Sequence, residues 1–145
     1  MAPSRIPDLI SKRRVGRVLV SVVNTSRKDP LPTVLHRLGI RHQGGENSTE
    51  LTADVARELL LTILTKGLAY NDDAMPLAVA TELVDTTMSV MFPAGAKLVT
   101  NLAGGIDDLR SRSYSLLWVT DATFPVGVVA IGGRSAACLW VEDED

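Results

Sequence analysis

The carboxyl end of the chain concentrates the side chains best suited to electrostatic chemistry. Four consecutive acidic residues occupy positions 142–145, directly after the apolar run 136–141 and with no linker between them. Because that run is typical of a buried strand, the four carboxylates are predicted to hold fixed positions on the surface. Ordered carboxylates suit a basic protein surface or a metal ion better than a flexible tail does. A solvated chain end is the alternative interpretation.

Two further acidic pairs, Asp72-Asp73 and Asp107-Asp108, are candidates for a metal site. A hard cation needs several oxygen ligands that converge on one point, and a calcium loop carries acidic residues at alternate positions around a glycine. Neither pair nor the terminal cluster has that spacing, so the sequence predicts no metal site and no cofactor. Asp72-Asp73 precedes Pro76 and is predicted to favour the start of a helix there.

The chain offers few residues for acid–base or nucleophilic catalysis. His36 and His42 are the only side chains whose ordinary pKa lies near neutrality, and neither has a cysteine or carboxylate at a recognisable ligand or triad spacing. The single cysteine, Cys138, lies among apolar residues and is predicted to be a small buried side chain. The Gly-Gly pairs lack the spacing of a phosphate-binding loop and predict turns. The sequence therefore does not predict an enzyme.

Charge is distributed unevenly along the chain. Residues 1–44 hold nine Lys or Arg against two Asp, a balance of +7, whereas the remainder holds six basic and fifteen acidic residues, a balance of −9. The two parts either neutralise each other across the fold or form opposite faces. The basic segment 12–17 could contact phosphates. No aromatic residue interleaves it and the isoelectric point is about 5.7, so nucleic acid is not the expected partner.

Length and composition indicate one domain spanning residues 1–145. A hydrophobic fraction of 46% and a mean hydropathy of +0.15 exclude intrinsic disorder. No apolar run approaches the roughly 18 residues of a membrane span, so no membrane contact is predicted. The basic N-terminal residues are not followed by the apolar core of a signal peptide. With one cysteine no internal disulfide can form, which favours the reducing cytoplasm.

The middle of the chain predicts two helices. The first is capped by Thr49 or Thr52 and ends at Lys66-Gly67, and the second begins at Pro76 and is ended by Pro93. Both carry wide apolar faces, so the helices are expected to pack on each other and on a sheet. The four-residue spacing in the first helix is seen in Leu51, Val55, Leu59 and Ile63.

The remaining segments predict a mainly antiparallel sheet. The turn-rich segment 24–32 is expected to be irregular, and the piece 34–40 to form a helical turn ended by Gly39. Strands are expected at 15–23, 97–102, 114–120, 126–131 and 136–141. The last three are apolar on successive residues, as in strands covered on both faces. The predicted fold is α+β, with an antiparallel β-sheet of about four to five strands packed against a central helical hairpin. The order of the strands is not predicted.

Two segments in the last third of the chain, 118–128 and 139–145, resemble the C-terminal region of small bacterial immunity proteins. These families are encoded beside polymorphic or contact-dependent growth inhibition toxins. The resemblance implies a cytoplasmic, non-enzymatic protein that binds one cognate toxin domain and covers its active site. Many such toxins are nucleases with basic clefts, which preorganised carboxylates can occupy. The candidate partner-binding residues are Asp121, Glu142, Asp143, Glu144 and Asp145.

Two other functions stay open at this stage. One is a small metal-dependent enzyme that uses carboxylates from separate strands. The other is a nucleic-acid-binding module that uses the basic N-terminal third. Trp118 and Trp140 lie in apolar runs and are predicted to be core residues, with a role as contact residues for a partner as the alternative. The sequence does not indicate the oligomeric state.

Overall fold

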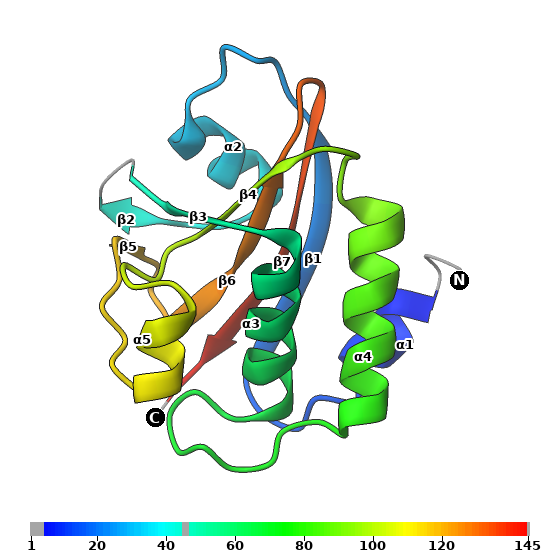
Figure 1. Cartoon of the computed structure of the whole chain (residues 1–145), viewed down its shortest axis with the longest axis vertical. Coiled ribbons are helices and arrows are strands. Elements are labelled where there is room, and N and C mark those ends of the chain that lie inside the picture. The colour runs from blue at the N-terminus through cyan, green and yellow to red at the C-terminus, as the bar shows by residue number, and fades with distance from the viewer. Residues whose placement is uncertain (1–4, 45–46, 145) are drawn as a thin grey trace.

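The computed structural model describes residues 5–44 and 47–144 and is built around one antiparallel sheet (Figure 1). Its strand order is β1-β7-β6-β4-β3, and β2 and β5 form a separate antiparallel pair. This arrangement confirms the predicted α+β fold. The strands of the main sheet are β1 (Arg17–Asn24), β3 (Thr49–Leu51), β4 (Lys97–Thr100), β6 (Phe124–Ile131) and β7 (Ser135–Asp143), and the pair consists of β2 (Gln43–Gly44) and β5 (Trp118–Val119).

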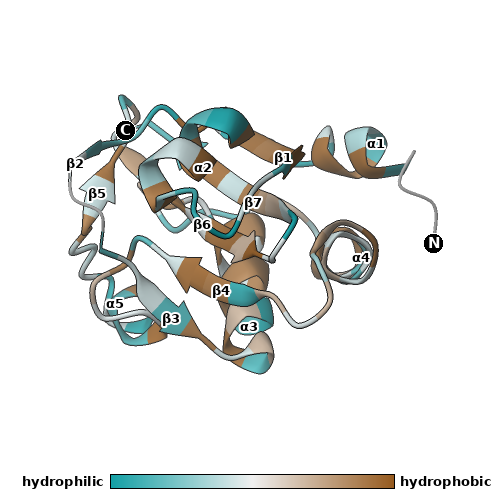
Figure 2. Cartoon of the chain, turned by 90° about the horizontal axis from the view of Figure 1, so that it is seen from above, coloured by the Kyte–Doolittle hydropathy of each residue, from teal (hydrophilic) through white to brown (hydrophobic). Residues whose placement is uncertain are grey.

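Helices cover both faces of the sheet. In Figure 2, α3 and α4 lie on one side of the sheet and α2 lies on the other. The helices α3 and α4 contact each other and α3 also contacts β6 and β7, as expected for a helical hairpin packed on a sheet. The helices are α1 (Ile6–Ile10), α2 (Leu31–Leu38), α3 (Ala53–Thr65), α4 (Leu77–Thr86), its π-helical continuation η2 (Thr87–Met91), and α5 (Ile106–Ser111).

The central strands β6 and β7 are buried on both faces, as their apolar sequences predict. Side chains alternate along a strand, so β7 divides its residues between two cores. Leu139 and Val141 join the core under α3 and α4, whereas Cys138 and Trp140 join the core under α2. A rigid central strand with two covered faces therefore leads directly into the acidic carboxyl end.

Local capping explains where two helices begin and end. Thr52, rather than Thr49, caps α3: its hydroxyl accepts a hydrogen bond from the Val55 N–H at 3.3 Å, while Thr49 belongs to β3. Gly39 ends α2 with a φ of 93°, as predicted. The prediction of irregular structure up to residue 32 was wrong at its end. Pro32 lies in the first turn of α2, where a missing N–H costs nothing.

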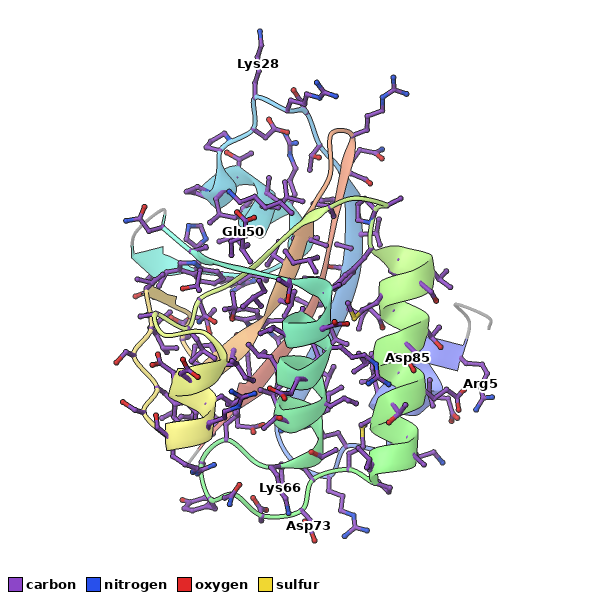
Figure 3. All side chains as sticks on the ribbon, in the orientation of Figure 1. Arg5, Lys28, Glu50, Lys66, Asp73 and Asp85 are labelled. Carbon is purple, nitrogen blue, oxygen red and sulfur yellow. The ribbon has the colours of Figure 1, made fainter. Side chains whose placement is uncertain are left out.

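One strand prediction was also wrong, and Asp73 makes a contact that the sequence did not indicate. Asp73 pairs with Lys66 across the turn that follows α3; Figure 3 shows the two side chains together. The strand expected at 114–120 is reduced to Trp118–Val119. Its earlier part runs alongside the segment after β4, where the Leu117 N–H donates to the Asn101 carbonyl oxygen at 2.8 Å.

The thiol of Cys138 is buried, as predicted, and lies 3.3 Å from the Ser21 hydroxyl oxygen. Burial raises the pKa of this thiol to about 11. We therefore expect Cys138 in the native protein to react with an aromatic disulfide reagent at least about 100-fold more slowly than in the urea-unfolded chain, because reaction needs both a thiolate and access. Equal rates in the two states would show that the α2 face of the sheet opens freely.

Candidate binding site

Three of the predicted partner-binding carboxylates gather at one open depression of about 580 Å³ at the carboxyl end of β7. Asp121 comes from the loop before β6, and Glu142 and Glu144 come from β7 and the residue just beyond it. The strand register brings these segments together, because Glu142 lies opposite Arg17 on β1 and opposite Pro125 on β6. The depression is lined by Arg17, Gly39, Arg41, Thr120, Asp121, Ala122, Glu142 and Glu144.

Glu142 is held from three directions and is only 15% exposed. One carboxylate oxygen pairs with the Arg17 guanidinium. The other accepts hydrogen bonds from the Thr120 hydroxyl at 2.7 Å and from the indole N–H of Trp140 at 3.4 Å. Its charge is therefore neutralised within the molecule, and its main effect is to fix the loop that carries Thr120 and Asp121.

Asp121 and Glu144 are exposed and are held by uncharged donors. Asp121 accepts a hydrogen bond from the Gln43 side-chain amide at 2.8 Å. Glu144 accepts two from Thr123, one from the backbone N–H at 3.3 Å and one from the hydroxyl at 2.7 Å. Because neutral donors orient a carboxylate without cancelling its charge, both side chains can attract a cation from outside the molecule.

Asp143 does not face outward, and this part of the sequence prediction was wrong. Its side chain is 3% exposed and forms two hydrogen bonds with the Arg13 guanidinium, at 2.6 and 2.8 Å. It also accepts the Leu68 N–H at 2.7 Å. The physical reason is strand alternation: β7 extends to Asp143, which lies on the α3 side with Val141, while Glu142 points to the opposite side.

The partner of Asp143, Arg13, also closes the end of α3. Its guanidinium donates to the carbonyl oxygens of Ile63 at 2.8 Å and of Leu64 and Lys66 at 3.2 Å. These carbonyls belong to the last turn of the helix, where intrahelical donors are lacking. Arg13 therefore ties together the segment before β1, the end of α3 and the end of β7. No local signal in the sequence indicates this contact, since 130 positions separate the two residues.

None of the remaining candidate contact residues is a described residue on the surface of the depression. Asp145 lies outside the described residues. Trp118 and Trp140 are 1% and 0% exposed, which confirms that they are core residues. Their rings stack at 5.1 Å with an interplanar angle of 9°, directly beneath the depression's Glu142. His42 meets Trp118 edge-on and His36 is exposed on α2.

The uneven charge of the sequence is partly neutralised across the fold. Arg13 pairs with Asp143, Arg17 with Glu142, and Arg5 with Glu82. Among the described residues Arg41 makes no ion pair, and it lines the depression beside the carboxylates. The depression is thus a mixed surface with two outward carboxylates rather than a uniformly acidic patch.

The two alternative functions gain little from this geometry. Within residues 5–44 and 47–144, no three His, Cys, Asp or Glu side chains, those of the depression included, are placed so that they could hold one metal ion. The basic segment 12–17 does not form a continuous cationic row, because Arg13 is buried and Arg17 is paired. The Thr120 hydroxyl in the depression is not free to act as a nucleophile in an enzyme, because it donates a hydrogen bond to Glu142 and accepts one from the Ala122 N–H. The arrangement suits electrostatic recognition.

Comparisons with protein-family models, with curated proteins and with solved structures found no match for this chain. The resemblance to immunity proteins therefore stays a prediction. None of the helices in the described part of the chain is both long and apolar enough to cross a bilayer.

Proposed function

We propose that this chain is a non-enzymatic immunity protein that binds and neutralises a cognate bacterial toxin domain in the cytoplasm. Contact is made through the depression, with Asp121 and Glu144 as the attracting charges. The observation that supports this most is their arrangement: both are exposed, both are oriented by neutral donors, and both stand at the end of a strand pair that is buried except at its ends.

The physics of inhibition fits these two residues. A nuclease toxin grips phosphate with a basic cleft, and exposed carboxylates steer the inhibitor toward it and speed association. Side chains that are already ordered lose little entropy on binding, so more of the attraction appears as affinity. Glu142 acts as a positioning residue through Thr120, and Asp143 holds the fold. Fewer carboxylates therefore contact the partner than the run of acidic residues at positions 142–145 indicates.

Charge reversal of the two outward carboxylates tests the proposal. The double variant Asp121→Lys/Glu144→Lys is expected to weaken binding to the toxin domain encoded by the neighbouring gene by about 10- to 100-fold at low salt. Most of the loss should be in the association rate, and the difference from the wild type should shrink at high salt as the charges are screened. Stopped-flow association and titration calorimetry measure both quantities.

A charge-matched control comes from carboxylates outside the depression. Glu50 on β3 is exposed and Asp85 on α4 is partly exposed; both are labelled in Figure 3, and each forms an ion pair at the surface. The variant Glu50→Lys/Asp85→Lys makes the same change in net charge and should bind nearly as the wild type does. If the two double variants weaken binding equally, net charge alone acts and the depression is not the contact surface.

A further inference from the structure

The two edges of the main sheet are built differently. The β3 edge is three residues long and carries the exposed Glu50, which pairs with Lys97. The β1 edge is eight residues long, and its segment 18–24 has no charged side chain. Among the described residues no strand pairs with the outer side of β1. Short length and charge protect an edge from further pairing, so β3 is protected and β1 is not.

Three devices that blunt an edge strand, a bulge, a proline and a lysine, are missing from β1, and the helices that contact the strand are α2 and the short η2. Its register with β7 runs without interruption from Arg17 opposite Glu142 to Asn24 opposite Ser135, so no bulge twists the edge away. The strand contains no proline or lysine. In an antiparallel ladder alternate residues direct their N–H and C=O groups to the other side, so β1 offers a regular row of donors and acceptors.

The strand is held firmly enough to act as a template. Val18 and Val20 pack against the core under α3 and α4, and Leu19 and Val23 pack against the core under α2. Val22 is the exception, with 45% of its surface exposed. The faces of β1 are thus covered by its own domain, while its edge and the Val22 side chain are available to another strand.

We propose that β1 pairs antiparallel with β1 of a second copy of this chain, joining the two sheets into one. A two-fold axis normal to the sheet reverses the strand and keeps every side chain on its original face. Two residues that lie opposite each other must then both have odd numbers or both have even numbers, because odd-numbered and even-numbered side chains of β1 lie on different faces. A register centred on Ser21 places Val20 opposite Val22 and Leu19 opposite Val23, which are favourable apolar pairs.

Charge does not oppose a second copy as the occupant, and the apolar pairs of this register favour it. In this register Arg17 stays outside the paired segment and remains with Glu142, so no like charges oppose each other across the new ladder. The depression is lined by Arg17 and so lies at the end of the strand, outside the paired segment 18–24. The dimer is therefore compatible with the proposed function but does not depend on it.

Val22→Lys tests the dimer. A lysine opposite Val20 of the second copy must lose hydration without gaining a partner, so the dimer dissociation constant should rise at least about 10-fold. Val119→Lys is the matched control, because Val119 is a similarly exposed strand valine, 37% exposed, on β5. Analytical ultracentrifugation should show a dimer for the wild type and for Val119→Lys, and a monomer for Val22→Lys. A wild type that stays monomeric, or a Val22→Lys variant that dimerises as well as the wild type, would overturn the proposal.

Hydrogen exchange of the wild type keeps the test decisive if Val22→Lys fails to fold. Amides in segment 18–24 that face outward should become more protected as the protein concentration rises, while amides of the β3 edge should not change. Protection that is independent of concentration contradicts self-pairing. Protection that appears only when the toxin domain is added would assign the edge to a strand of that partner, and the dimer would be wrong.

Discussion

Replacing Arg13 by alanine is expected to lower the free energy of unfolding by about 3–5 kcal/mol. The substitution leaves the Asp143 carboxylate buried with, among the described residues, only the Leu68 N–H as a donor, and it removes three hydrogen bonds from the last carbonyls of α3. A buried charge without its partner is much more costly than a surface pair. Urea denaturation followed by circular dichroism measures the change, with a midpoint well below that of the wild type.

Arg17→Ala is the control for Arg13→Ala, because it breaks the neighbouring ion pair with Glu142, at the same end of β7. The Arg17 side chain is 65% exposed, so the loss should be less than about 1 kcal/mol. If Arg13→Ala cost no more than Arg17→Ala, the buried pair would not tie the three segments together. The same logic applies to Asp143: reversing its charge would report unfolding, and loss of partner binding in such a variant would say nothing about the interface.

Trp140→Ala is expected to destabilise the protein by about 3–5 kcal/mol. The side chain is fully buried, it stacks on Trp118, and its removal leaves a large cavity in the smaller of the two cores. Thermal and urea unfolding should both show the loss. Tyr70→Ala is the control, since Tyr70 is an aromatic residue that is 71% exposed and should cost little.

Trp140→Phe separates packing from hydrogen bonding at the same position. Phenylalanine refills part of the cavity but cannot donate to Glu142 as the indole N–H does. We expect an intermediate loss of stability, because large aromatic burial is partly retained. A Trp140→Ala variant as stable as the wild type would mean that the core under α2 collapses around the gap, and that the two tryptophans do not support the depression.

Periodicity predicted most of the elements but not their arrangement. The helices α3 and α4 and the strands β6 and β7 follow from local patterns, because each pattern is complete within its own segment. The order of the sheet is different, since β1 pairs with β7 at the other end of the chain. The pairing of β1 with β7 depends on how the whole chain folds. No short segment of the sequence therefore predicts it.

The acidic end shows how a small error in a strand boundary changes a site. The sequence predicts that the strand ends at Val141 and that the four following carboxylates form one surface patch. The strand in fact continues to Asp143, and alternation sends that residue to the core side. Extending the strand by two residues would have placed Asp143 beside Val141 and Leu139. The identity of its partner Arg13 could not have been found, because the contact depends on how the segment before β1 crosses the end of α3.

Chemical-shift mapping of the complex tests the central claim most directly. On titration with the cognate toxin domain, backbone amides of Thr120, Asp121, Ala122 and Glu144 should shift or broaden, because they border the depression. Amides of α4, on the side of the sheet away from α2, should stay in place. Perturbations centred on α4, with none at the depression, would contradict the assignment of Asp121 and Glu144 as the residues that attract the partner.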